Sequence, residues 1–188
     1  MTEVARARPA LRLAVIGLSG CGKSTTAGLI ADFAARHDLR LAVVKLATPL
    51  YDLQSAVYAR AGVPLARGAQ DQILLESLAD TLRRLRPDAL VADFTARLAT
   101  ADADIVVNDD LRDPDVDAPA LRDLGFRIVR VVADPRTRAA RLAARADLTR
   151  ADRSTAGLDR IEPDVVIDNS GSLAALADAV TRLLRSWL

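Results

Sequence analysis

Residues 17–24 read GLSGCGKS and fit the pattern G-x-x-x-x-G-K-[ST] in full. The stretch before them, LRLAVIGL (11–18), is apolar and rich in branched residues, which is typical of a buried strand. From Lys23 to about Arg36 the apolar residues recur at helical spacing. A glycine-rich turn between a buried strand and a helix is the setting in which this motif binds nucleotide phosphates. The alternative is a glycine-rich turn between strand and helix that binds no ligand. It would not explain why every position of the motif is matched.

Each part of the motif has a predicted role. Glycines allow consecutive backbone N–H groups to curl round a phosphate, because a Cβ atom would block that approach. Lys23 is expected to reach the β- and γ-phosphates, and the Ser24 hydroxyl to bind Mg²⁺. Thr25 supports the first helical turn and can reach the α-phosphate. The predicted cofactors are therefore ATP and Mg²⁺, and the loop residues predicted to bind them are Ser19, Gly20, Cys21, Gly22, Lys23, Ser24 and Thr25.

The rest of the chain predicts an α/β fold. Further apolar runs at 40–46, 104–109, 126–134 and 163–172 are expected to be strands, with helices over 136–146 and 173–184. Strands that alternate with helices imply right-handed crossovers and a parallel sheet covered on both faces. We expect a five-stranded P-loop kinase fold in one domain, 1–188, with a helical insertion over about 50–100 that covers one end of the sheet.

Composition narrows the classes of partner. The 188 residues carry a net charge of +1, so no general basic surface favours nucleic acid or membranes. No apolar run is long enough to suggest a spanning helix, and the single cysteine, Cys21, agrees with a reducing cytoplasm. We expect a cytoplasmic enzyme, monomeric or homodimeric, whose partner is a small-molecule nucleotide substrate.

A second polar segment follows the predicted strand at 104–109. It reads NDDLRD (108–113). A carboxylate at the C-terminal end of a strand beside the phosphate loop is where proteins with this motif hold Mg²⁺, so Asp110 is predicted as a catalytic and metal-side residue. Arg112 is placed to bind an anionic acceptor through its fork of donors. The alternative is a turn of solvated charges.

Arginines crowd the predicted helix at 136–146. Arg138, Arg141 and Arg145 are spaced to share one face, together with Arg136 nearby. Like charges on one face favour an anion between them, and we expect a lid over about 135–155 that places Arg138 and Arg141 on the transferring phosphoryl group. The alternative is a solvated face in an arginine-rich protein.

Four further stretches resemble the deoxynucleoside monophosphate kinases of T-even phages, within the wider nucleoside monophosphate kinase group. They are VKLATPLYDLQ (44–54), VVNDDLRDPDVDAPALRDLGFRIVRVV (106–132), STAGLD (154–159) and DVVIDNSGSLAAL (164–176). With the phosphate loop they reach nearly the whole chain, but the insertion at 50–100 is matched poorly and is shorter than in the phage enzyme.

The resemblance implies roles for particular residues. Asp110 and Arg112 would serve the acceptor phosphate, with Lys45 nearby, and Asn169 and Gly171 would lie beside the adenine of ATP. Ser170 belongs to the same loop, and Ser154 and Thr155 match the segment after the lid. The acceptor base would lie under the insertion, near a set of polar residues: Tyr51, Tyr58, Gln70, Gln72 and Glu76.

The predicted reaction is ATP + (d)NMP → ADP + (d)NDP, so the enzyme would be a phosphotransferase. Two alternatives stay open. One is a P-loop kinase for another small phosphorylated acceptor, such as phosphomevalonate, dephospho-coenzyme A or a modified antibiotic nucleotide. The other is a nucleotide-binding switch protein, against which stands the lack of an NKxD-type guanine-reading segment.

Overall fold

The computed structural model describes residues 10–144 and 157–188. In chain order the elements are β1 (Leu11–Ile16), α1 (Lys23–Arg36), β2 (Leu41–Val43), α2 (Thr48–Ala61), α3 (Gln72–Leu85), α4 (Ala89–Ala99), β3 (Ile105–Asn108), α5 (Asp117–Asp123), β4 (Phe126–Val132), α6 (Pro135–Ala143), a 3₁₀ turn (Leu158–Arg160), β5 (Val165–Asp168) and α7 (Leu173–Trp187).

The five strands form one parallel sheet in the order β2-β3-β1-β4-β5. This confirms the predicted α/β class and each predicted strand, although β2 is only three residues long. Strand β1 lies between β3 and β4, so the chain leaves β1 toward one edge of the sheet and later returns to the other. In such sheets ligands bind beyond the carboxyl ends of the strands at this point of reversal.

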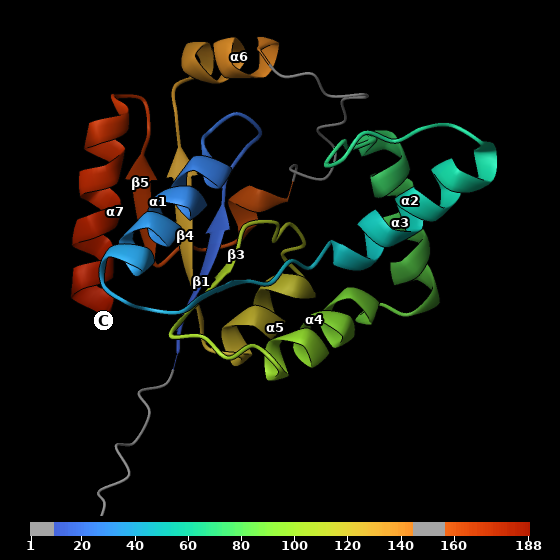
Figure 1. Ribbon diagram of the computed structural model, residues 1–188, viewed down its shortest axis with the longest axis horizontal. Helices are drawn as coiled ribbons and strands as arrows, with labels where there is room; N and C mark the ends of the chain where they lie inside the picture. The colour runs from blue at the N-terminus through green and yellow to red at the C-terminus, as the bar shows by residue number, and fades with distance from the viewer. Residues whose placement is uncertain (1–9, 145–156) are drawn as a thin grey trace, which may run out of the picture.

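Helices cover both faces of the sheet (Figure 1). On one face α1 and α7 pack against alternate residues of β1 and β4, with Ile30, Phe33 and Leu184 fully buried. The other face is covered by α2, α3, α4 and α5, where Phe94 and Phe126 are in contact. The continuous apolar runs of the central strands are explained by this burial on two sides.

The predicted helical insertion is present as α2, α3 and α4. Helix α3 begins at an N-cap, Asp71, whose side chain accepts from the backbone N–H of Leu74. Its inner face buries Leu75 and Ala79 in the same cluster as the sheet. Leu85, the last residue of α3, is exposed. None of the described helices is long and apolar enough to cross a membrane.

Candidate active site

The phosphate loop occupies the turn between β1 and α1, as predicted. Gly17 and Gly22 have φ angles of 149° and 104°. A Cβ atom on Gly17 would lie 2.3 Å from the carbonyl oxygen of Val131, and one on Gly22 would lie 2.2 Å from Nδ2 of Asn169. A side chain at Gly17 would therefore displace the backbone of β4, and one at Gly22 would displace the side chain of Asn169.

The first turn of α1 is open to a ligand. Its N-cap is Gly22, which provides no side-chain cap, and the side chains of Ser24 and Thr25 are exposed. Lys23 folds back over the loop, and its Nζ donates to the carbonyl of Gly17 at 2.7 Å. Uncapped N–H groups, the positive end of a helix and a lysine ammonium together fit a bound polyphosphate.

Asn169 connects the loop to the end of β5. Its Nδ2 donates to the carbonyl of Cys21 at 2.8 Å, and its side chain lines a hollow together with Gly22 and Thr25. This position beside the loop is consistent with the predicted adenine side. The side chain of Cys21 is buried in the core, so only the backbone of this loop residue can contact a bound phosphate. Gly171 lies two residues further along and does not line this hollow.

Helix α6 lies over the phosphate loop (Figure 1). Arg138 donates from Nε to the carbonyl of Ser19 at 3.0 Å, and Arg141 donates from Nη2 to the carbonyl of Asn169 at 3.2 Å. The other terminal nitrogen of Arg141, Nη1, is buried without a hydrogen-bond partner among the described residues. A buried guanidinium nitrogen that lacks a partner beside a phosphate loop fits an anionic ligand. Arg145, Ser154, Thr155 and the rest of the predicted lid beyond α6 lie outside the described residues.

The oxygen donors around the loop suit Mg²⁺. The Ser24 hydroxyl and the carboxylates that follow β3 are hard ligands of the kind this ion prefers. No group of three or more metal-binding side chains is assembled within residues 10–144 and 157–188. A site with few protein ligands is expected when phosphate oxygens and water complete the coordination.

Asp110 is turned toward the backbone between β2 and α2. Its two carboxylate oxygens accept from the N–H groups of Leu46, at 2.8 Å, and Ala47, at 3.0 Å. The amide of Asn108 also donates to it at 2.7 Å. Burial raises the pKa of Asp110, and these three donors oppose that rise. Asp110 therefore holds the β2–α2 connection against the end of β3, and its predicted contact with the metal stays a prediction.

Asp109 is the first residue after β3 and forms the second carboxylate of this turn. Its Oδ1 lies 2.9 Å from Nζ of Lys45, which follows β2. Partial burial would lower the pKa of Lys45, but the hydrogen bond and charge of Asp109 outweigh it, so that pKa is raised and the ammonium stays charged. Asp109 was not predicted as a site residue from the sequence, although its place directly after a buried strand next to β1 was a usable signal.

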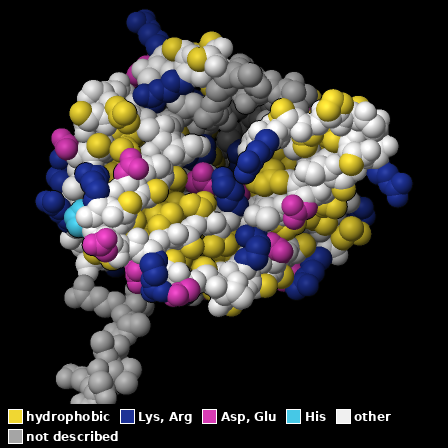
Figure 2. Space-filling view, viewed as in Figure 1, with side chains coloured by type: hydrophobic (Ala, Val, Ile, Leu, Met, Phe, Trp, Pro, Cys, Tyr) yellow, Lys and Arg dark blue, Asp and Glu magenta, His cyan; other side chains and the backbone are white. Residues whose placement is uncertain are grey.

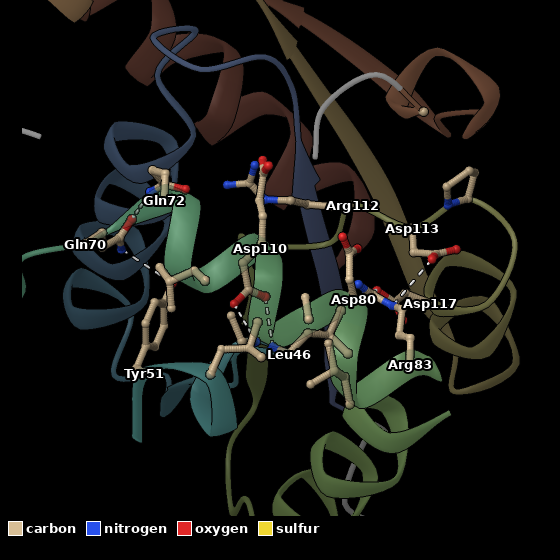
Figure 3. A pocket seen from close by; sticks show the side chains of 18 residues that line it. Leu46, Tyr51, Gln70, Gln72, Asp80, Arg83, Asp110, Arg112, Asp113 and Asp117 are labelled. Atoms are coloured by element: carbon tan, nitrogen blue, oxygen red, sulfur yellow. Dashed lines mark hydrogen bonds and ion pairs between the residues drawn. The ribbon is translucent and has the colours of Figure 1, made fainter. Parts of the chain in front are cut away.

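A cavity of about 290 Å³ lies between the sheet and α3. In Figure 2, acidic and basic side chains gather round a hollow between the sheet and the arm formed by α2 and α3. The cavity walls include apolar side chains from three elements, among them Leu50, Leu75 and Leu90. Arg112 and Asp110 lie at its centre in Figure 3. Of the predicted acceptor residues, this cavity brings together Tyr51, Gln70, Gln72, Glu76, Asp110 and Arg112.

Polar side chains occupy both flanks of the cavity (Figure 3). On one flank Gln70 donates to the hydroxyl of Tyr51 at 3.4 Å and accepts from Gln72 at 2.7 Å. On the other flank lie Arg83 and Asp117, with Asp80 and Asp113 beside them. Two of the predicted residues, Lys45 and Tyr58, do not line the cavity, and the Tyr58 hydroxyl instead donates to Asp71 at 2.9 Å.

The sequence analysis did not identify the Arg83 flank. Arg83 follows Leu75 and Ala79 at intervals of four residues, so it continues the buried face of α3. An arginine at an apolar position of an amphipathic helix was the available signal. Asp117 had no comparable signal, because its burial depends on the packing of α5 against β4 and α4 and on its pairing with Arg83 of α3.

No protein-family model matches the chain, and no curated protein is significantly similar to it in sequence. Solved structures are similar in fold. TT1252 from Thermus thermophilus is 19% identical with a TM-score of 0.58, covering 96% of this chain and 100% of that one. A sugar kinase from Janibacter sp. HTCC2649 is 21% identical (TM-score 0.53, 94% and 95% covered). Shikimate kinase from Acinetobacter baumannii, in complex with shikimate, is 12% identical (TM-score 0.56, 95% and 93% covered). At these identities the likeness establishes the fold alone, and the chain has the α/β P-loop kinase fold.

Proposed function

We propose that the chain is an ATP- and Mg²⁺-dependent phosphotransferase that phosphorylates a nucleoside or deoxynucleoside monophosphate. The observation that carries the proposal is the arrangement of two sites at one edge of the sheet. The phosphate loop follows β1, and the cavity that contains Arg112 opens beside the end of the neighbouring β3. A kinase of this kind needs a donor site and an acceptor site that meet at the transferring phosphoryl group.

The chemistry requires positioning more than acid–base catalysis. The acceptor is already a phosphate dianion, so no strong base is needed to activate it. Lys23, Arg138 and Arg141 surround the loop and would stabilise the charge that develops on the γ-phosphate. Bound Mg²⁺ would supply further charge neutralisation there. Arg112 would orient the acceptor phosphate.

A hydroxyl acceptor is the second candidate, and the charge of the cavity favours it. Seven charged side chains line the cavity: Glu76, Asp80, Asp110, Asp113, Asp117, Arg83 and Arg112. Carboxylates accept hydrogen bonds from hydroxyl and amino groups but repel anions. Asp109 would then be the candidate base, although its pairing with Lys45 opposes that role. The sugar kinase and shikimate kinase with this fold add support.

The deciding experiment is ADP formation from ATP and Mg²⁺ against a panel of acceptors. The panel holds ribo- and deoxyribonucleoside monophosphates, modified pyrimidine nucleotides, phosphomevalonate, dephospho-coenzyme A, shikimate and gluconate. Strong stimulation by one or a few nucleotides, with the nucleoside diphosphate identified by mass, would support the proposal. Stimulation only by hydroxyl acceptors would replace it with the second candidate, and ATP hydrolysis unaffected by every acceptor would favour a nucleotide switch.

Arg112→Ala separates the two sites within this assay. We expect a higher KM for the acceptor and a lower kcat, each by about tenfold, because one charge-assisted contact is lost. The KM for ATP should change little. A collapse of ATP binding would instead place Arg112 on the donor side.

A further inference from the structure

The flank of the acceptor cavity that contains Arg83 and Asp117 is polar, buried and incompletely hydrogen-bonded. The side chain of Asp117 is only 2% exposed. Its Oδ2 accepts from Nη2 of Arg83 at 2.7 Å, while its Oδ1 is buried without a hydrogen-bond partner among the described residues. Nε of Arg83 is also buried without one, and lies 3.4 Å from a carboxylate oxygen of Asp113.

These missing bonds distinguish the flank from a structural ion pair. A buried ion pair is tolerated when further hydrogen bonds satisfy its remaining donors and acceptors. Here one carboxylate oxygen and one guanidinium N–H find no partner within residues 10–144 and 157–188, at a free-energy cost to the folded protein. Both residues line the cavity, so a ligand there could supply both partners.

The opposite flank lacks this property. Its members, Tyr51, Gln70 and Gln72, hydrogen-bond to one another in a chain. The two flanks lie on either side of Arg112 in Figure 3. An acceptor whose phosphate is held by Arg112 can therefore extend toward Arg83 and Asp117 and form hydrogen bonds with Nε of Arg83 and Oδ1 of Asp117.

We propose that Arg83 and Asp117 form the subsite that recognises the end of the acceptor remote from its phosphate. Asp117 accepts a hydrogen bond from an N–H group of the ligand, and Arg83 donates one to the ligand atom beside that group. This inference rests on the proposed function, under which that end is a nucleobase. The matching chemistry is a base edge with an exocyclic amino group next to a ring nitrogen. The carboxylates of the cavity favour amino-bearing bases, and Leu75, Ala79 and Leu90 provide an apolar surface for a flat ring.

Acceptor pairs in which one base carries an exocyclic amino group that the other lacks test the subsite. The kcat and KM of the full chain are measured at saturating ATP for guanosine against inosine monophosphate and for cytidine against uridine monophosphate. Asp117→Asn keeps the shape but replaces one acceptor oxygen by a donor. We expect the KM for the preferred amino-bearing acceptor to rise about tenfold or more, as for loss of a hydrogen bond to a charged group. The KM for the partner without the amino group should change little, so that the preference disappears, and the KM for ATP should stay constant.

Matched controls lie on the same helices. Asp123→Asn changes an exposed carboxylate of α5, and Arg84→Met changes the exposed neighbour of Arg83, and neither should alter the base preference. Arg83→Lys retains the positive charge but loses the Nε donor, and it gives a second measurement if Asp117→Asn folds poorly. The subsite would be overturned if a variant raised the KM equally for both acceptors of each pair, or if the base preference were unchanged in both Asp117→Asn and Arg83→Lys. The proposed kinase function would stand in either case.

The wild-type enzyme separates failure of the subsite from failure of the proposed function. If it phosphorylates only a hydroxyl acceptor, the nucleotide proposal fails, and the recognition of a nucleobase fails with it. If no acceptor is phosphorylated and no nucleoside monophosphate raises the melting temperature in the presence of an ATP analogue, both proposals are overturned.

Discussion

The phosphate loop and the acceptor cavity lie at the same edge of the sheet but are assembled in different ways. The loop is one continuous segment between β1 and α1, and its ligand-facing groups are mainly backbone N–H groups and Lys23. The cavity is lined by the β2–α2 connection, α2, α3, α4, the turn after β3 and the start of α5, which together run from Leu46 to Asp117, and by Gly157 further along the chain. A site made from one segment can be recognised locally, whereas a site made from several depends on their packing.

The largest effect should come from the loop. Lys23→Ala should lower kcat by about a thousandfold or more, because it removes an ammonium from the developing charge on the transferring group. The melting temperature should stay close to that of the wild type, since the Lys23 side chain is only partly buried and donates to the carbonyls of Gly17 and Leu18 within the loop. Turnover by a folded Lys23→Ala protein near the wild-type rate would contradict the assigned role of the loop.

Helix α6 offers a matched pair on the donor side. Arg141→Ala should raise the KM for ATP and lower kcat, together by about ten- to a hundredfold in kcat/KM, because its unpartnered Nη1 is available to a phosphate. Arg136→Ala, at an exposed position of the same helix, should have little effect. Equal losses in the two variants would indicate a general electrostatic effect of α6 rather than a contact from Arg141.

Asp110 lines the acceptor cavity and holds the β2–α2 connection, so its substitution should affect stability. Asp110→Ala leaves the N–H groups of Leu46 and Ala47 without their acceptor, at a cost of about 3 kcal/mol in the free energy of unfolding. Urea denaturation measures this loss. Asp109→Asn, which breaks only the pair with Lys45, should cost less. A stable Asp110→Ala protein that needs much more Mg²⁺ for activity would show that Asp110 is a metal-side residue instead.

The smallest effect concerns pH. Burial raises the pKa of Asp117 to about 6, and Arg83 only partly opposes this, while Asp113 adds to it and Asp80 lines the same flank. Because the native state binds this proton more tightly than the unfolded chain, Asp117 should make the unfolding free energy fall as pH rises from about 4 to about 7. Comparing wild type with Asp117→Asn isolates this contribution. A constant difference between the two proteins across that range would show that the carboxylate does not titrate there.

Much of the fold was predictable because its patterns are local. The five strands are indicated by runs of branched apolar residues, and the helix after the loop is indicated by helical spacing. The bend of Asp110 toward the backbone of Leu46 was not predictable, because a carboxylate in an acidic turn can face solvent, metal or backbone equally well. Tyr58 was placed near the acceptor base by what the resemblance implies for the insertion, yet its hydroxyl donates to Asp71 instead.

The sequence by itself determined the phosphate loop, the parallel α/β class and the helical insertion, because each depends on residue types at fixed spacings along one segment. Only the tertiary structure decided which carboxylate accepts hydrogen bonds from the β2–α2 connection. It also decided which polar residues line the cavity and on which flank their hydrogen-bonding groups lack partners among the described residues. Those properties arise from distances between segments and from burial, since a carboxylate acquires a raised pKa or a missing partner only when another element packs over it.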